Sequence, residues 1–106
     1  MKIKLEIINN GGIEVKEFST IRMRGRALKR MLEVQDVMQE AEEANVFTES
    51  HFDLMCEFIC EMFGNQFTVD QLVDGVDLEE IYPIARKLCE EIGNKTMKKI
   101  DKLVKK

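Results

Sequence analysis

Two alternating segments joined by Asn-Asn-Gly-Gly constrain the fold of this chain most strongly. KIKLEII and IEVKEF alternate apolar and polar side chains, and Asn-Gly between such segments is a strong hairpin signal. Pairing Ile7 with Ile13 and Leu5 with Val15 gives both segments one apolar face. It leaves a three-residue loop, Asn-Asn-Gly, in which Gly11 is expected to take the left-handed conformation. The sequence therefore predicts a β-hairpin over about residues 2–18. Because an isolated two-stranded ribbon is marginally stable, its apolar face must lie on helices or on another copy.

After the hairpin, apolar side chains recur at the three- and four-residue spacing of helices. Glycines interrupt this pattern at Gly64, Gly75 and Gly93 and predict helix ends. Pro83 lies past the first turn of the last helix, so it predicts a kink there or a helix start at Tyr82. We therefore expect a mostly helical α+β fold. The predicted helices cover about residues 24–43, 48–63, 69–73 and 78–92 and are followed by a basic, helical C-terminal tail.

The second predicted helix is expected at the centre of the core. It is apolar on two faces, and either Thr48 or Ser50 can cap its start. It carries Cys56 and Cys60 one turn apart, with His51 a turn before them, which superficially suggests metal ligation. A zinc site requires four ligands in a closed tetrahedron, whereas FDLMCEFICEMF surrounds these cysteines with apolar side chains. We expect buried, reduced thiols and no metal.

Five carboxylates crowd around one glycine in FTVDQLVDGVDLEE, as they do in a calcium loop. An EF-hand loop beginning at Asp70 needs oxygen ligands at its third and twelfth positions, and these are Leu72 and Ile81. Thr68 and Gln71 instead match a capping box, which begins a helix. The segment is therefore interpreted as a junction between helices rather than a metal site.

The length of 106 residues predicts a single domain over residues 1–106 with one modest core. No stretch approaches the roughly 20 apolar residues of a membrane span, and the alternating N-terminus is unlike a signal peptide. These features predict a cytosolic protein with no membrane partner. The chain has one His and one Tyr, with no catalytic grouping and no glycine-rich phosphate loop. We expect no enzymatic activity, no catalytic residues and no cofactor.

Charge is divided into three blocks along the chain. Residues 1–30 hold eight Lys or Arg against three acids, and residues 86–106 hold the same numbers. Residues 31–85 hold fourteen acids and no Lys or Arg. Such segregation indicates surfaces of opposite sign, which meet either within the fold or between copies. The basic patch predicted to mediate self-association comprises Arg22, Arg24, Arg26, Lys29 and Arg30.

Two classes of function are compatible with these charges. One is a nucleic-acid-binding module that uses RMRGRALKR and KKIDKLVKK. Neither segment contains an aromatic side chain for base stacking, and the acidic middle block would repel phosphates, so nucleic acid is the weaker hypothesis. The other is a small cytosolic regulatory or adaptor protein that binds one helical partner.

The segment QFTVDQLVDGVDLEEIYPIARKL, placed after a hairpin and a helix that ends in Phe-Gly, carries a family resemblance. It resembles the tail assembly chaperones of long-tailed phages that infect Gram-positive bacteria, or of prophages that those bacteria carry. In that family an aromatic side chain and a T-x-D-x-L-x-D-G element precede a helix containing Leu, Ile and Pro. The matching residues here are Phe67, Thr68, Asp70, Leu72, Asp74, Gly75, Leu78, Ile81, Tyr82 and Pro83.

The resemblance implies a non-enzymatic chaperone. Such proteins coat the tape measure protein during tail assembly in the host cytoplasm, recruit the tail tube protein and are absent from the finished virion. Coating a long protein requires many copies, and surfaces of opposite sign favour head-to-tail association into rings or spirals. Four apolar residues are candidate anchors for partner helices, although an ordinary place in the core is the favoured alternative for each: Phe67, Val69, Leu72 and Tyr82.

Overall fold

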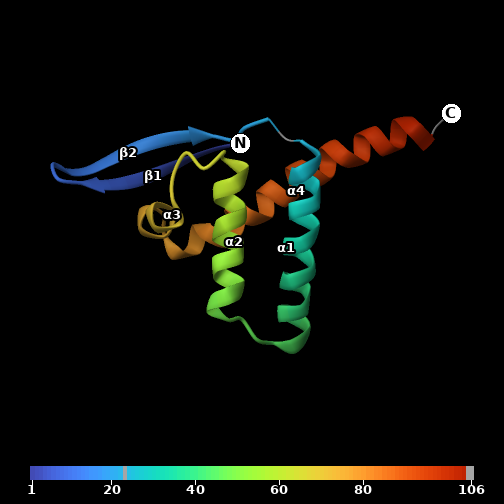
Figure 1. Cartoon of the computed structure of the whole chain (residues 1–106), viewed down its shortest axis with the longest axis horizontal. Coiled ribbons are helices and arrows are strands. Elements are labelled where there is room, and N and C mark those ends of the chain that lie inside the picture. Colours follow the sequence, from blue (N-terminus) through green and yellow to red (C-terminus); the bar gives the residue numbers. More distant parts are fainter. Residues whose placement is uncertain (23, 105–106) are drawn as a thin grey trace.

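An antiparallel β-hairpin leads into four helices, which confirms the predicted α+β, mostly helical fold (Figure 1). The computed structural model describes the backbone of residues 1–22 and 24–104 and the side chains of residues 1–22 and 24–94. In chain order the elements are β1 (Lys2–Asn9), β2 (Gly12–Ser19), α1 (Gly25–Ala44), α2 (Glu49–Met62), α3 (Val69–Gly75) and α4 (Leu78–Val104).

The helical body is built around α2. Helices α1 and α2 lie side by side and run in opposite directions, α4 packs across both, and α3 contacts β1 and α2 (Figure 1). The chain measures 58 × 33 × 19 Å along its principal axes, because the hairpin and the end of α4 extend from opposite sides of this body. One hydrophobic cluster draws buried side chains from β1 and from all four helices.

The hairpin has a different register from the one predicted. Leu5 lies opposite Lys16 and Ile8 opposite Ile13, so the predicted pairing is wrong by one residue. The cause lies in the turn, where Asn9 Oδ1 accepts the N–H of Gly11 at 3.3 Å and Gly12, rather than Gly11, takes a positive φ of 122°. The turn therefore holds two residues instead of the predicted three, which moves every partner by one position. Because successive strand residues point to opposite faces, β2 then presents its other face to the helices.

This register exposes part of the apolar surface that the prediction had placed inside. Ile3 and Leu5 are buried against the helices, so the base of the hairpin packs on its own subunit. Ile13 and Val15, which were predicted on the buried face, are instead 66% and 61% exposed on the opposite face, beside Ile8 at 68%. The tip of the hairpin therefore carries β-branched side chains that its own chain leaves uncovered.

Helix α2 lies at the centre of the core, as its two apolar faces predicted. Phe58, Ile59 and Cys56 are fully buried. Thr48 caps the helix by accepting the N–H of His51, and the His51 ring accepts the N–H of Thr48 in return at 2.9 Å. The chain leaves the helix through Gly64, which has a positive φ of 67°. Thr48 and Gly64 therefore mark the start and the end of this helix, as predicted.

Helix α3 is pressed against β1 at Gly75. A Cβ atom at this position would lie 2.8 Å from the backbone oxygen of Glu6 and 3.3 Å from the Cβ of Leu5. Gly75 is the last residue of the helix and has no positive φ, so the prediction that it ends α3 holds for a different reason. The glycine is required because helix and strand backbones approach closely, rather than by a left-handed cap. The Thr68–Gln71 capping box starts α3 as predicted.

Helix α4 is longer than predicted. It begins at Leu78, so Pro83 does not shift the start to Tyr82, and it continues through Gly93 to Val104. The predicted end near residue 92 is therefore wrong, because one internal glycine costs a helix only about 1 kcal/mol. The backbone of the basic tail is helical to Val104, while its side chains lie outside the described residues.

Candidate functional site

The cysteines lie in the core and His51 serves as a helix cap. Cys56 and Cys60 are buried free thiols, and burial raises the pKa of each to about 11, with nearby ionisable groups adding to the shift. Protonated thiols of this kind are poor nucleophiles and poor metal ligands. Within the part of the chain whose side chains are described, no group of three His, Cys, Asp or Glu side chains could hold a metal ion.

The buried thiols predict a loss of stability at alkaline pH. The pKa of each thiol is about 11 in the folded chain against an ordinary 9.0, so the folded chain keeps protons that the unfolded chain releases. The contribution of the two thiols to the free energy of unfolding is then fully present below pH 9.0 and is lost as the pH rises towards 11. Between about pH 8 and about pH 10 we expect the free energy of unfolding in urea to fall by roughly 1–3 kcal/mol.

A variant with Cys56→Ala and Cys60→Ala is the control, since other groups also titrate in this range. It should lose clearly less stability over the same pH interval. An equal loss in the variant and the parent chain would show that the thiols are not the cause.

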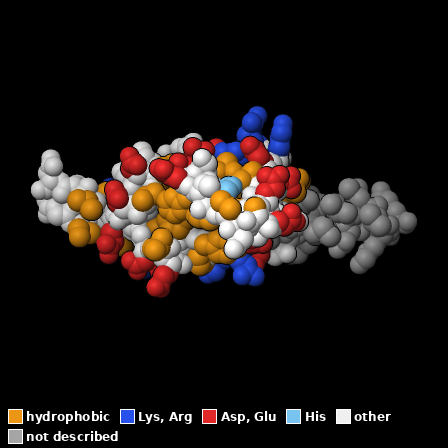
Figure 2. All heavy atoms as spheres, turned by 90° about the horizontal axis from the view of Figure 1, so that it is seen from below, with side chains coloured by type: hydrophobic (Ala, Val, Ile, Leu, Met, Phe, Trp, Pro, Cys, Tyr) orange, Lys and Arg blue, Asp and Glu red, His pale blue; other side chains and the backbone are white. Residues whose placement is uncertain are grey.

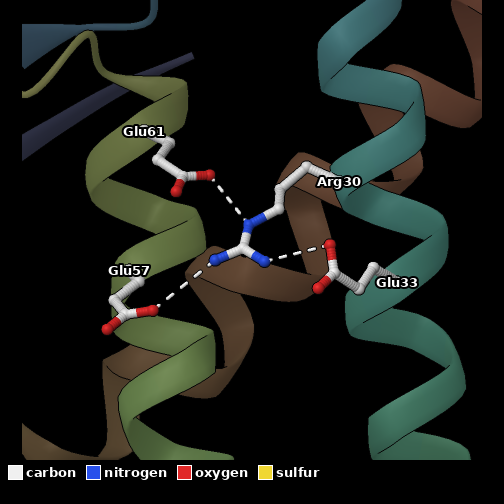
Figure 3. Close-up of polar contacts among 4 residues, drawn as sticks. All are labelled: Arg30, Glu33, Glu57 and Glu61. Atoms are coloured by element: carbon white, nitrogen blue, oxygen red, sulfur yellow. Dashed lines mark hydrogen bonds and ion pairs between the residues drawn. The ribbon is translucent and has the colours of Figure 1, made fainter.

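Arg30 contacts three carboxylates and ties α1 to α2 through two of them, Glu57 and Glu61 (Figure 3). Its Nε donates to Glu61 at 2.9 Å, and its terminal nitrogens lie 3.0 Å from Glu33 and 3.5 Å from Glu57. Partial burial alone would lower the pKa of the Arg30 guanidinium, but hydrogen bonds to Glu33 and Glu61 outweigh it and hold that pKa above its ordinary value. One arginine of the predicted basic patch is therefore neutralised inside the subunit by the acidic block.

The rest of the predicted basic patch is exposed. Arg22, Arg24, Arg26 and Lys29 all lie at the surface near the start of α1, and none forms an ion pair with a residue whose side chain is described. The structure thus separates the patch into Arg30, which is committed to the fold, and four cations that are available to another molecule.

Three of these arginines line an open groove of about 630 Å³, here called the arginine groove. Arg22, Arg24 and Arg26 supply its positive charge. Arg30 with its partners Glu33 and Glu61 forms a further part of its wall. Its apolar lining comes from Ile21, Ala27 and Met62. The groove therefore combines apolar surface with guanidinium groups that have no ion pair among the described residues, which suits a ligand that carries both carboxylates and apolar side chains.

The four predicted partner anchors lie in different environments. Phe67 is buried and packs its ring against two other phenylalanine rings, at centroid distances of 5.0 and 5.5 Å. Leu72 is fully buried and Val69 is partly buried against the core. Tyr82 is 48% exposed. Of the four, only Tyr82 presents a large part of its side chain to a partner in the folded chain.

Tyr82 lies beside a shallow groove of about 130 Å³ between α1 and α4, here called the α1–α4 groove. Its apolar lining comes from Val34, Met38, Met55, Tyr82, Ala85 and Cys89. A groove between two helices with an apolar floor is the kind of surface that accepts the apolar face of a third helix.

Tyr82 was predicted from the sequence as a partner anchor, whereas the α1 side of this groove was not. Val34 and Met38 lie one helical turn apart, as do Leu78 and Tyr82 at the start of α4. This spacing is visible in the sequence and marks pairs on one helix face. What the spacing cannot show is that Leu78 and Tyr82 remain exposed after the helices have packed.

A second apolar surface lies at the turn between α1 and α2. Val46 and Phe47 are 51% and 57% exposed there, and the sequence analysis did not single them out. Figure 2, viewed from the side of this turn, shows hydrophobic side chains across the middle of the face and acidic side chains around them. The acidic block therefore borders apolar surface rather than forming a purely polar face.

The geometry described so far offers surfaces for binding proteins and no catalytic centre in the described part of the chain. Residues 1–106 match the family model of the phage tail chaperone protein. The chain belongs to this family. Comparisons with curated proteins and with solved structures give no match.

The tail chaperone family is non-enzymatic, and this membership confirms the prediction that the chain is not an enzyme. It also confirms the coarser part of the resemblance, namely a phage tail chaperone that works with tail proteins. No helix among the described residues of this tail chaperone is both long enough and apolar enough to cross a membrane.

Proposed function

We propose that this tail chaperone binds the tape measure protein in the host cytoplasm, keeps it soluble during tail assembly and self-associates along it. The observation that carries the proposal is the family match over the whole of residues 1–106. Recruitment of the tail tube protein and absence from the finished virion belong to the same proposal. So does a long-tailed phage or prophage of a Gram-positive host, which rests on the resemblance of the segment around Gly75.

The α1–α4 groove is the proposed site for the tape measure protein. Tyr82 stands at the edge of the groove, and Val34 and Met38 supply the apolar side that faces it from α1. A long helical protein presents apolar side chains at every turn, and a shallow apolar groove can hold such a stripe without a fixed sequence. The adaptor hypothesis predicts the same kind of contact, but the family match favours the chaperone.

The site can be tested by replacing Tyr82 with glutamate. The chain and the tape measure protein of the same phage are co-expressed, and the tape measure protein that stays soluble and copurifies is measured. Tyr82→Glu places a charge at the edge of the groove, so we expect the copurifying amount to fall roughly tenfold or more. The fold should be retained because glutamate is a good helix former and the position is half exposed.

Leu32→Glu is the matched control. Leu32 is also in a helix and is 49% exposed, but it does not line the α1–α4 groove. This variant should copurify the tape measure protein as well as the parent chain does. Equal binding by Tyr82→Glu and the parent would remove the groove as the site, and no binding by the parent would contradict the proposed function itself.

A further inference from the structure

The turn between α1 and α2 is suited to insert into a groove on another molecule. Asn45 adopts a left-handed conformation, with a φ of 53°, and its N–H closes α1, while the N–H of Val46 is bonded to the carbonyl of Ala41 at 3.0 Å. Phe47 lies against the ring of His51, with ring centroids 5.9 Å apart. The turn is therefore held in one shape although it exposes two apolar side chains.

Acidic side chains surround this apolar pair. Glu42, Glu43 and Glu49 are exposed on either side of Val46 and Phe47, and none of the three forms an ion pair with a described residue. We call residues 42–49 the acidic tip. It presents an apolar centre with a rim of negative charge, which is the complement of the arginine groove.

The acidic tip and the arginine groove lie at opposite ends of α1. The groove is next to Gly25, where α1 begins, and the tip follows Ala44, where it ends (Figure 1). A helix of 20 residues is about 30 Å long. Tip and groove of one subunit therefore cannot meet, so any contact between them joins two molecules.

We propose that the acidic tip of one copy docks in the arginine groove of the next copy. Phe47 and Val46 enter against the apolar lining formed by Ile21 and Met62, while the glutamates of the tip approach Arg22 and its neighbours. The contact rests on the self-association in the proposed function and assigns it to named surfaces. It uses different patches on the two copies, so it propagates into a ring or an open spiral instead of closing as a dimer.

The occupant is argued from complementarity of both charge and polarity. A nucleic acid would satisfy the three arginines with its phosphates, but none of the described lining residues is aromatic, so its bases would have no ring to stack on. The acidic tip supplies both kinds of group from one rigid turn, and the groove and the tip occur on every copy in equal number.

The proposal can be tested with two variants that each destroy one surface. The groove variant carries Arg22→Glu, Arg24→Glu and Arg26→Glu, and the tip variant carries Val46→Ser and Phe47→Ser. All five side chains are exposed, and acids at the start of α1 suit its dipole, so both variants should fold. Circular dichroism and urea unfolding of each variant verify this.

Light scattering after size exclusion then gives the mass of each sample over a range of protein and salt concentrations. The parent chain should form oligomers that dissociate at high salt. Each variant alone should need roughly tenfold or more protein to associate. An equimolar mixture of the two should form dimers and nothing larger, because only one intact tip and one intact groove remain per pair.

This mixture separates head-to-tail docking from other interfaces. Monomers in the mixture while the parent chain assembles would overturn the proposal and leave the proposed self-association standing. Parent-like assembly of either variant would do the same. A parent chain that stays monomeric throughout would overturn both the docking proposal and the proposed self-association. If the mixture forms no dimer, and a labelled single-stranded oligonucleotide binds the parent chain but not the groove variant, the groove is a phosphate-binding site and the docking proposal is wrong.

Discussion

Replacing Phe67 with alanine is expected to lower the free energy of unfolding by about 3–5 kcal/mol. Phe67 is buried, and its ring contacts Phe18 of the hairpin and Phe63 at the end of α2. Alanine would leave a cavity where the hairpin joins the helical body, and the surrounding rings are held by separate elements that cannot all close in. Urea unfolding followed by circular dichroism measures the change.

Phe47→Ala is the matched control for this experiment, because it deletes the same side chain at an exposed position. Measured at a protein concentration too low for copies to associate through the acidic tip, its free energy of unfolding should stay within about 0.5 kcal/mol of the parent chain. A small effect of Phe67→Ala would mean that the ring is not a core residue, and it would revive Phe67 as a surface anchor for a partner.

The second large effect is expected at Gly75. Gly75→Ala would place a methyl group 2.8 Å from the backbone oxygen of Glu6, closer than real Cβ contacts allow. Because that oxygen belongs to strand β1 and not to a flexible side chain, α3 must move away from the hairpin. We expect the free energy of unfolding to fall by about 1–3 kcal/mol.

Gly93→Ala provides the comparison within the same chain. Gly93 lies inside α4 and has no positive φ, and no described atom lies within 4 Å of an added Cβ. Alanine there should raise the free energy of unfolding by about 0.5–1 kcal/mol, through its higher helix propensity. If both substitutions destabilise the chain equally, the close approach of α3 and β1 is not the reason for glycine at position 75.

Local signals in the sequence were sufficient to predict where the strands and helices lie. The Asn-Gly turn marked the hairpin, and the reciprocal hydrogen bonds of Thr48 with His51 and of Thr68 with Gln71 fix two helix starts that lie within one or two residues of the predicted ones. These signals work because capping and turn formation involve groups only two or three residues apart. The predicted register of the hairpin was wrong because Gly12, and not Gly11, took the left-handed conformation.

The candidate surfaces were less predictable than the elements. The sequence predicted both Tyr82 and Phe67 as partner anchors and could not distinguish the exposed one from the buried one, since both are aromatic residues in one short segment. It also could not show that Arg30 would be paired by Glu57 and Glu61, which lie 27 and 31 positions away. Both distinctions depend on how α1, α2 and α4 pack.

Neighbouring residues and composition are enough to predict the hairpin, the order and approximate limits of the helices, the central place of α2 and the segregation of charge. Which apolar side chains remain uncovered, and which charges remain unpaired, depends on how the elements pack. The tertiary structure buried Phe67 and left Phe47 exposed, and it paired Arg30 while leaving Arg22, Arg24 and Arg26 without ion pairs among the described residues. The reason is physical: burial and ion pairing are relations between residues far apart in the chain, and they exist only once the helices have packed.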